Sequence, residues 1–404
     1  MNLSRLLNLA SLFAEITLSR FFAVKPATPL SSEECSRVRR ILVFGYFGLG
    51  DAVMILPMLR TLHLLFPEAK LDCIASRRTA AYHVLRLAGI FDTIHFFEFK
   101  NASFGERRRM NQFLTAQGYD CVICSYTAPI EYFVPFLRSA PRRAGHSLAV
   151  KGSAKTHLRP DWLLHYRTEL LPDEQIHETE RYARIVRALA AGADVTAGSE
   201  TFRFFTTPVA SKRHSAPHIA VHAAVSPALN WKNWGNERFI QLCKRLVNEL
   251  NATVTLLGDA SEREALEEMS KAIAETDDKT NTDRVCVSTP RAGDHSTESL
   301  AETCRVLASC DAFVGNESGL GHIAMALGIP SVRIFGMTDY ASFRALDAPH
   351  TDIRKDLPCS PCFVLGQIKK QSLNMHTCGH RNCLNTISVE EVFNAVAEKL
   401  PSRA

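Results

Sequence analysis

The sequence predicts an α/β protein built from two Rossmann-like, doubly wound domains that face a cleft. Short apolar runs typical of buried parallel strands alternate with segments of helical periodicity along most of the 404 residues. Several of these runs end in a glycine turn that opens a helix, which is where α/β sheets bind ligands. The alternation occurs twice, on either side of a polar stretch, and a chain of this length usually needs more than one hydrophobic core.

A helix-like stretch, Met1–Phe22, and a linker make up residues 1–37, which we treat as a separate N-terminal segment. Apolar residues cover most of this helix, and a polar stripe runs along it. The stripe consists of Ser4, Asn8, Ser11, Glu15 and Ser19. Polar residues interrupt the apolar ones too often for a signal-peptide core or a membrane-spanning helix. The helix is expected either to lie on a membrane surface or to dock on its own protein or a partner.

The first domain is expected over residues 38–210. An apolar run at Ile41–Phe44 is typical of a buried strand, and it leads through a glycine turn into a helix from Asp51 to about Phe66. Further strands are predicted at Leu71–Ala75, Thr93–Phe97 and Cys121–Cys124, and helices at Ala80–Leu87 and Glu106–Gln117. This order is that of a doubly wound βαβ domain.

The second domain is expected over residues 211–387, after a polar boundary at Thr207–Pro217, and residues 388–404 are expected to form a C-terminal helix. Strands are predicted at Ile219–Ala223, Thr253–Leu257, Val285–Ser288, Ala312–Val314 and Val332–Phe335. Helices are predicted at Asn236–Leu250, Glu262–Ala274, Ser299–Ala308 and Leu320–Leu327. The last helix, Ser388–Leu400, carries a capping box at its start.

Composition and charge favour a globular protein with an acidic partner. The chain is 46% hydrophobic and 22% charged, which is typical of neither disordered nor membrane-spanning proteins. Its net charge of +5 is mild, but basic residues are concentrated between Arg138 and Arg167, where the only nearby acid is Asp161. They are Arg138, Arg142, Arg143, Lys151, Lys155, Arg159 and Arg167. A basic loop of this kind suits a phosphate, a carboxylate or an anionic membrane, and no nucleic-acid partner is expected; the alternative is a solvated loop.

The cysteines indicate a reducing compartment, because most of them are scattered among apolar runs rather than arranged as a disulfide framework. The exception is a group near the C-terminus, with His376 and His380 nearby. It consists of Cys359, Cys362, Cys378 and Cys383. A C-x-x-C pair followed by two more cysteines could supply the four ligands of a structural zinc; a loop of free thiols or a disulfide is the alternative.

The turn that follows the strand at Ala312–Val314 is the most informative one in the sequence. Gly315, Gly319 and Gly321 leave room for backbone N–H groups at the next helix start to approach an anionic ligand. Glu317, Ser318 and His322 belong to the same stretch. The alternative is an ordinary strand-to-helix turn with Ser318 as its N-cap.

In the first domain, the turn Gly45–Asp51 has the spacing G-x-x-G-x-G. This is neither the dinucleotide fingerprint nor a P-loop, so nicotinamide chemistry is disfavoured. Asp51 could deprotonate an attacking hydroxyl, a role worth roughly 10²–10⁴-fold in rate. It could equally cap the helix that starts there.

Two further turns of the second domain carry candidate ligands. Lys232 lies between a strand and a helix, where its ammonium could meet a diphosphate, although a solvated loop lysine is the simpler interpretation. The turn Leu257–Glu262 offers Asp259 or Glu262 to ribose hydroxyls, or to the dipole of the helix that follows.

Together these motifs resemble glycosyltransferase family 9, the heptosyltransferases of lipopolysaccharide core synthesis, which have the GT-B fold. The resemblance runs from Ile41 to about Leu400 and excludes residues 1–37. Its motifs, in order, are Gly48-Leu49-Gly50-Asp51 with Leu56-Pro57, Lys232-x-Trp234 with Glu237 and Phe239, Gly258 with the acid after it, Glu317-Ser318-Gly319-x-x-His322, and Phe335-Gly336-x-Thr338-Asp339. Each motif is short, but the ordered set over most of the chain is specific.

The resemblance implies transfer of a heptose from ADP-heptose to an acidic, lipid-linked acceptor, with inversion and no obligatory metal. It assigns Asp51 as general base and Lys232 to the donor diphosphate. Ser318 and Gly319 would contact phosphate, and Glu262 ribose. It also places the acceptor at the basic loop. Glu317 and His322 belong to the donor motif, but the family more commonly has aspartate at the position of Glu317, so the donor sugar could differ from the usual heptose.

This assignment implies a cytoplasmic protein that works at the inner face of the cytoplasmic membrane. Two alternatives remain from the sequence. One is a catalytically silent GT-B scaffold that binds an envelope glycolipid or a partner protein. The other is a nucleotide-sugar epimerase on the same fold, which would need no acceptor.

Overall fold

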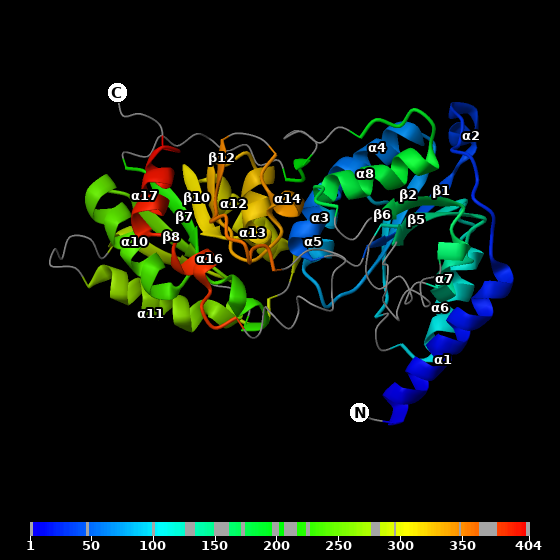
Figure 1. Ribbon diagram of the computed structural model, residues 1–404, viewed down its shortest axis with the longest axis horizontal. Coiled ribbons are helices and arrows are strands. Elements are labelled where there is room, and N and C mark those ends of the chain that lie inside the picture. Colours follow the sequence, from blue (N-terminus) through cyan, green and yellow to red (C-terminus); the bar gives the residue numbers. More distant parts are fainter. Residues whose placement is uncertain are drawn as a thin grey trace. The chain divides into compact units, whose positions relative to one another are not determined.

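The computed structural model of the protein forms two compact units, Met1–Ala197 and Gly198–Ala404, each built around a six-stranded parallel sheet (Figure 1). This confirms the predicted α/β class with two doubly wound sets of elements. The structure describes residues 3–45, 48–98, 102–125, 134–148, 161–170, 174–195, 202–205, 216–223, 227–275, 283–294, 296–346, 349–362 and 378–400. The expected domain boundary, Thr207–Pro217, lies almost entirely outside these residues.

The sheet of the first unit has the strand order β3-β2-β1-β4-β5-β6, and all its neighbours pair in parallel. Its strands are β1 (Arg40–Gly45), β2 (Lys70–Ala75), β3 (Thr93–Phe96), β4 (Cys121–Cys124), β5 (Arg142–Leu148) and β6 (Tyr166–Leu170). Its longer helices are α1 (Leu3–Ser19), α4 (Leu56–Leu65), α5 (Ala81–Ala88), α6 (Phe104–Ala116) and α8 (Glu178–Leu189). Shorter ones are α2 (Ser32–Arg37), α3 (Leu49–Met54), α7 (Val134–Leu137), η1 (Arg20–Phe22) and η5 (Asp161–Leu163).

Both faces of this sheet are covered, as a parallel sheet requires. Alternate residues of β1 point to opposite faces, and Leu42 and Phe44 join a buried cluster that also contains residues of α1, α6 and α7. The other face packs against α8, which contacts β5 and β6 and also lies against α4 and α3. The sheet is therefore held between two helical layers (Figure 1).

Two predictions for this unit were wrong in detail. The segment predicted to be a basic loop contains β5 and β6, so Arg142 and Arg143 lie in a strand. The sequence analysis did not predict these two strands because charged and polar residues interrupt their apolar residues. The single helix predicted from Asp51 to about Phe66 is divided at Ile55 into α3 and α4. Pro57, in the first turn of α4, cannot donate a backbone hydrogen bond inside a continuous helix.

The second unit repeats the arrangement with the strand order β12-β11-β10-β7-β8-β9, again parallel throughout. Its strands are β7 (His218–His222), β8 (Thr253–Leu257), β9 (Val285–Ser288), β10 (Ala312–Asn316), β11 (Ser331–Ile334) and β12 (His350–Ile353). Its helices are η6 (Pro227–Lys232), α10 (Asn236–Leu250), η7 (Ala260–Glu262), α11 (Arg263–Ala274), α12 (Thr297–Ala308), α13 (Gly319–Ala326), α14 (Tyr340–Phe343), α16 (Asn382–Asn385) and α17 (Val389–Ala397).

The final helix begins as the sequence predicts. Ser388 is the N-cap of α17, its hydroxyl accepts the backbone N–H of Glu391, and the Glu391 carboxylate accepts the N–H of Ser388 at 2.8 Å. This reciprocal pair satisfies two backbone donors that a helix start otherwise leaves unbonded. None of the helices in the described part of the chain is long and apolar enough to cross a bilayer.

Candidate donor and acceptor sites

The candidate donor residues of the second unit lie at one edge of its sheet. Strands β8, β7 and β10 are neighbours and run in parallel, so the turns after them meet at their carboxyl ends. Glu317 and Ser318 follow β10 directly, Glu262 follows β8 within η7, and Lys232 ends η6 in the segment after β7. This is the edge at which open α/β sheets bind ligands.

A buried carboxylate forms the centre of this group. Glu317 is almost completely buried and forms an ion pair with the Lys232 ammonium. Its Oε2 also accepts a hydrogen bond from the Thr338 hydroxyl at 3.0 Å, and its Oε1 lies 3.9 Å from Nε2 of His322. Lys232 is itself mostly buried, and its ammonium lies 5.3 Å from the centre of the Trp231 ring. The structure therefore brings together Lys232, Glu317 and His322, all predicted to bind the donor substrate, and Lys232 and Glu317 form an ion pair with each other.

The charge of Glu317 is set by its neighbours. Burial acts to raise the pKa of this carboxyl, but the Lys232 ammonium and the hydrogen bond and charge of His322 outweigh burial, and the pKa lies well below its usual range. Glu317 is therefore ionised at every physiological pH, and it holds Lys232 in place by charge. An anionic ligand that reaches Lys232 would share it with this carboxylate.

Ser318 does not cap α13 through its side chain, contrary to the capping interpretation. Its hydroxyl instead lies 3.1 Å from Nδ1 of His222, the last residue of β7. Burial lowers the pKa of His222 to about 4, although the nearby Asp259 opposes this effect, so the imidazole is neutral at pH 7. His222 was not predicted as a site residue, although its position at the carboxyl end of a strand is a signal that could have identified it.

The first residues of α13 lie next to this pair, and Ser318 and Gly319 are partly exposed. A helix start presents unbonded backbone N–H groups, which suit a phosphate. Gly315, just before it, allows two strands to approach closely, because a Cβ there would come within 2.7 Å of the His222 carbonyl oxygen. The predicted need for small residues in this turn thus has a steric cause.

Asn316 and Trp234 fix the segment that carries Lys232. The Asn316 amide is completely buried; its Oδ1 accepts the Trp234 backbone N–H at 2.9 Å and its Nδ2 donates to the Ala223 carbonyl at 2.8 Å. The Trp234 indole donates to the Ile387 carbonyl at 3.0 Å and packs edge-on against Phe239. Trp234 therefore holds this loop by burial, and the Asn316 amide clamps it to β10, a contact that the sequence does not predict.

Glu262 and Asp259 have structural partners of their own. The Glu262 carboxylate accepts the Asp259 backbone N–H at 2.8 Å, and Asp259 Oδ1 accepts the N–H of Ser261 at 2.7 Å. Both acids thus cap η7. Burial raises the pKa of Glu262, with the Asp259 N–H acting in the opposite direction. Both carboxylates thus serve the helix start, the alternative to a ribose contact, through capping hydrogen bonds, and a ribose contact would be additional to these.

In the first unit, Asp51 lies in the first turn of α3, beyond the carboxyl end of β1. Its Oδ2 accepts the Gly48 backbone N–H at 3.0 Å, so Asp51 contributes to the helix start. Its side chain is partly exposed. Both of the interpretations considered for Asp51, capping and proton abstraction, are compatible with this position.

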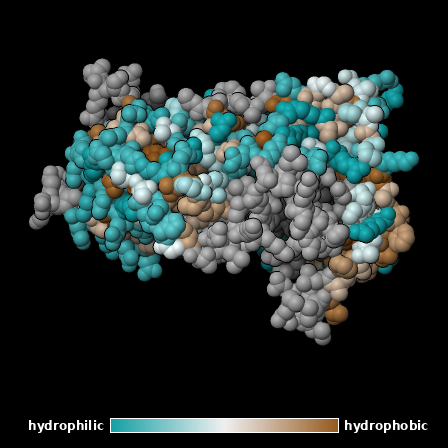
Figure 2. Space-filling view, in the orientation of Figure 1, coloured by the Kyte–Doolittle hydropathy of each residue, from teal (hydrophilic) through white to brown (hydrophobic). Residues whose placement is uncertain are grey.

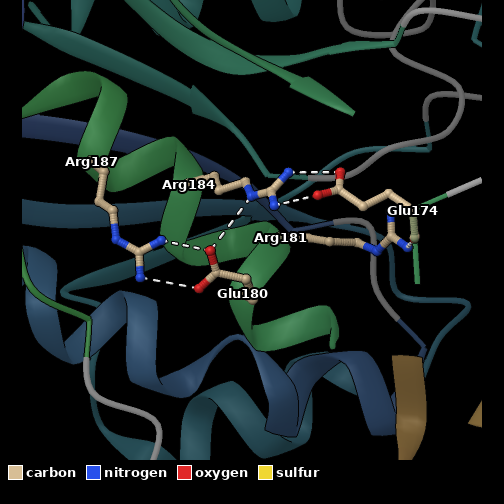
Figure 3. A network of polar contacts seen from close by, with 5 residues as sticks. All are labelled: Glu174, Glu180, Arg181, Arg184 and Arg187. Atoms are coloured by element: carbon tan, nitrogen blue, oxygen red, sulfur yellow. Dashed lines mark hydrogen bonds and ion pairs between the residues drawn. The ribbon is translucent and has the colours of Figure 1, made fainter. Parts of the chain in front are cut away.

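A network of arginines and glutamates orders the helix that packs beside α3 (Figure 3). Arg184 binds Glu174 through two parallel hydrogen bonds of 2.5 and 2.7 Å, and Arg187 binds Glu180 in the same way at 2.7 and 3.0 Å. Arg181 donates to the Glu174 carbonyl at 3.1 Å. Forked pairs of this kind are geometrically specific. The contacts of Arg181 and Arg184 with Glu174 fix the residue just before α8 to the helix, at the same sheet edge as Asp51, whereas the Arg187–Glu180 pair lies within α8.

His146, near the carboxyl end of β5, lies beside this network. It is buried, and within the described ranges neither of its ring nitrogens has a hydrogen-bond partner. Burial, together with the charges of Arg181 and Arg184, lowers its pKa to about 3. His146 is therefore a neutral imidazole, which adds no positive charge to the arginines around it.

The predicted acceptor arginines gather at the opposite edge of the sheet. Arg142 and Arg143 begin β5, and Arg138 precedes them at the end of α7. Val122 of β4 pairs with Leu42 of β1 on one side and with Arg143 of β5 on the other, so Arg143 and Leu42 lie at the same level of the sheet. Strand β1 ends at Gly45, three residues beyond that level. This separation is roughly 10 Å along the strands. Lys151 and Lys155 lie outside the described residues.

Among the described residues, no carboxylate is paired with Arg143. Arg143 is buried, and no hydrogen bond or ion pair of its side chain is found in the described part of the chain. Burial, and then the charge of Arg138, lower the pKa of Arg143. The pKa of His165 is lowered mainly by burial and further by the charge of Arg143. Leaving a buried guanidinium unpaired is costly, and an anion would remove that cost.

The four C-terminal cysteines lie near one another. Burial raises the pKa of Cys383, and the charges of Cys362, Cys378 and Cys359 raise it further, which requires these thiols to be close. All four are free thiols, and Cys378 Sγ lies 3.9 Å from Nε2 of His380. Among the side chains that the structure describes, however, no group of three or more potential ligands is arranged to hold a metal ion. His376 lies outside the described residues. The zinc site therefore stays a prediction from spacing.

Comparison with known proteins gives one consistent result. The sequence model of glycosyltransferase family 9 (heptosyltransferase) matches residues 107–372. Lipopolysaccharide heptosyltransferase 2 of Escherichia coli (strain K12) is 26% identical over 324 residues, which cover 74% of this chain and 82% of that protein.

Two solved structures share the architecture. The structure of E. coli ADP-heptose lipopolysaccharide heptosyltransferase II superposes with a TM-score of 0.61 at 21% identity, covering 89% of this chain and 98% of that one. E. coli heptosyltransferase WaaC with ADP-2-deoxy-2-fluoro heptose gives a TM-score of 0.60 at 20% identity, covering 89% and 99%.

Proposed function

Because this chain belongs to glycosyltransferase family 9, the heptosyltransferase family, it is a glycosyltransferase, and we propose that it transfers a heptose or a related sugar from an ADP-sugar to an acidic acceptor of the lipopolysaccharide core. Its fold is GT-B, as the sequence predicts. The proposed donor follows from the relatives, one of which is named for ADP-heptose and another of which was solved with a fluorinated ADP-heptose.

The observation that carries the proposal is the group around Glu317 in the second unit. An ammonium, Lys232, is held by a buried carboxylate beside the start of α13, where backbone N–H groups and the Ser318 hydroxyl are available. A diphosphate carries charge that suits both elements. We assign Lys232 to the diphosphate, Ser318 and Gly319 to its oxygens, and Glu262 to the ribose. Glu317 and His322 would orient Lys232 and approach the sugar.

The proposed reaction is a single displacement with inversion. The acceptor hydroxyl attacks the anomeric carbon, the bond from that carbon to the phosphate oxygen breaks, and ADP leaves. Asp51 takes the hydroxyl proton as general base. Lys232 and the α13 start stabilise the charge that develops on the leaving diphosphate. As in the family that it resembles, the proposed mechanism needs no obligatory metal.

The acceptor is proposed to bind the first unit through Arg138, Arg142 and Arg143, with Lys151 and Lys155 nearby in sequence. Arg143 supports this assignment, because its buried charge lacks a partner in the described part of the chain. The roughly 10 Å along the strands between Arg143 and the end of β1 suits an acceptor of more than one sugar. Its anionic group would bind at a distance from the reacting hydroxyl. The acceptor being lipid-linked, we place the enzyme at the inner face of the cytoplasmic membrane.

The test is release of ADP from ADP-heptose with and without a deep-core lipopolysaccharide acceptor. Acceptor-dependent release is expected from the natural protein. Asp51→Asn should reduce turnover by about 10²–10⁴-fold while ADP binding is kept. Glu106→Gln is the matched control, because Glu106 also accepts the N-cap backbone N–H of its own helix.

The outcomes separate the proposed transferase from its alternatives. Equal turnover by Asp51→Asn and Glu106→Gln would remove Asp51 from the chemistry. No release from the natural protein with any ADP-sugar would favour a silent scaffold. Nucleotide release that does not depend on the acceptor would favour an epimerase.

A further inference from the structure

Helix α1 turns part of its polar stripe toward the protein and leaves several large apolar side chains exposed. Among its described side chains, Leu12, Ile16 and Ser19 are buried, and Ser11 and Glu15 are partly buried beside them. A surface helix normally buries its apolar side and exposes its polar side. The docking prediction for this helix is confirmed, with part of the polar stripe at the contact.

Specific contacts hold the polar side. Arg107 of α6 is buried; its Nε donates to Glu15 Oε2 at 2.8 Å and its Nη2 to the Ser11 hydroxyl at 2.8 Å. On the same helix, the Ser19 hydroxyl accepts the Trp162 indole N–H at 3.1 Å. A buried, hydrogen-bonded arginine fixes a helix more precisely than apolar packing alone. The orientation of α1 is therefore specified by the chain itself.

As a result, large apolar side chains are exposed on one surface. Leu18 and Phe21 are 58% and 83% exposed, and α6, which packs beside α1, adds the exposed ring of Phe104 at its start. Among the described side chains, the exposed large apolar residues of α1, η1 and the start of α6 are Leu7, Phe13, Leu18, Phe21, Phe22 and Phe104, which we call the apolar surface. Brown and tan residues gather there at the lower right of Figure 2, over α1. Contiguous exposed apolar surfaces of this kind mark interaction sites.

The charge around the apolar surface is positive. Arg20, Arg108, Arg109 and Arg138 are exposed beside it. The only acid of α1, Glu15, is neutralised by Arg107. Arg138 lies over the Phe22 ring, 3.5 Å from its centre, so the apolar surface adjoins the arginines assigned to the acceptor. An apolar strip bordered by arginines complements an anionic lipid surface better than it complements a second, equally basic copy of this chain.

We propose that the apolar surface is a membrane-docking site, with α1 lying in the interface of an anionic bilayer and its exposed Leu and Phe side chains among the acyl chains. This proposal deepens the proposed function, because it rests on an acceptor that is lipid-linked. Docking of α1 would hold Arg138, Arg142 and Arg143 at the lipid surface, next to the point where the head group of a lipid-linked acceptor leaves the bilayer.

The test is co-sedimentation of the full chain with vesicles of phosphatidylglycerol and phosphatidylethanolamine, and with vesicles of phosphatidylcholine alone. Leu18→Glu combined with Phe21→Glu should reduce binding to the anionic vesicles at least about tenfold, since two apolar side chains leave the interface. Leu64→Glu is the matched control, because Leu64 is 81% exposed on α4, away from the apolar surface. All three side chains are exposed, so folding should be unchanged. Binding should weaken in high salt and be weaker on phosphatidylcholine.

Equal vesicle binding by the double variant and by Leu64→Glu would overturn the proposal. A second outcome would also overturn it: the natural protein binds no vesicles but forms a dimer, and the double variant does not dimerise. The apolar surface would then join two copies of the chain. Turnover on a soluble, delipidated acceptor separates this proposal from the proposed function. The double variant should keep that activity, whereas absence of that activity in the natural protein would count against the transferase and not against docking.

Discussion

At the scale of single residues, the main finding is that Lys232 and Glu317 are partners. The sequence predicts that both residues contact the donor, and it gives no sign that they contact each other, since 85 positions separate them. Removing one member of a buried pair leaves an uncompensated charge, which typically costs about 3–5 kcal/mol. The pair therefore links donor binding to the stability of the second unit.

This link predicts a pH effect. The folded-state pKa of Glu317 lies below its unfolded value, so its contribution to stability is present above roughly pH 4.3 and is lost as the pH falls further. Urea unfolding of the natural protein should show this loss beginning below roughly pH 4.3 and continuing as the pH falls toward the lowered folded-state pKa. Glu317→Gln should be less stable at pH 7 and should lose less on acidification. Parallel pH curves for the two proteins would contradict the assignment.

A second prediction concerns the ammonium. Lys232→Ala should weaken ADP binding about tenfold to a hundredfold, because a charged hydrogen bond to phosphate is lost. Calorimetric titration measures this, with Lys271→Ala, an exposed lysine of α11, as control. The double variant Lys232→Ala with Glu317→Gln should recover stability without recovering ADP affinity. If it recovers both, Lys232 serves folding and does not bind the donor.

At the scale of elements, apolar pattern determined what could be predicted. Strands β4, β8 and β9 match their predictions residue for residue, because each is a compact run of apolar or β-branched residues. Strands β5 and β12 were missed because charged and polar residues interrupt them, and pairing with a neighbouring strand makes them strands. The same limit applied to α1: periodicity located its polar stripe but could not show which side faces the protein.

The clamp between β10 and the Lys232 segment allows an element-scale prediction. Asn316→Ala would leave the Trp234 N–H and the Ala223 carbonyl buried without their partner, at a cost of about 1–3 kcal/mol for each group. We expect a lower melting temperature and faster hydrogen exchange in the segment around Trp234. Asn394→Ala, at an exposed amide of α17 that bonds Glu390 within the same helix, should change neither. Unchanged exchange near Trp234 would show that burial of the indole alone fixes the loop.

At the scale of the whole molecule, the chain separates its candidate chemistry between two units. Lys232, Glu317 and Ser318 belong to the second unit, and Asp51 and Arg143 to the first. The sequence predicted these assignments because glycine turns after apolar strands are local signals. It could not predict the Lys232 ion pair, the Asn316 clamp or the isolation of Arg143, since each depends on residues that only folding brings together.

This division predicts that the two binding functions can be lost independently. Arg143→Ala should weaken binding of the acidic acceptor and leave ADP affinity unchanged, whereas Lys232→Ala should do the opposite. Surface plasmon resonance with each ligand separately measures both. Arg86→Ala, at an exposed arginine of α5, is a basic control outside the Arg138–Arg167 stretch. A loss of ADP affinity in Arg143→Ala would contradict separate sites.

His222 is neutral and Glu317 is ionised at neutral pH, and this limits how these two groups can shape the dependence of the reaction rate on pH. Neither group changes protonation between about pH 5 and pH 9, given a histidine pKa of about 4 and a carboxyl pKa below the usual range. These two groups therefore contribute no bend to a rate profile over that interval. An acidic limb in such a profile would report a proton acceptor elsewhere, and its disappearance in Asp51→Asn would identify which one.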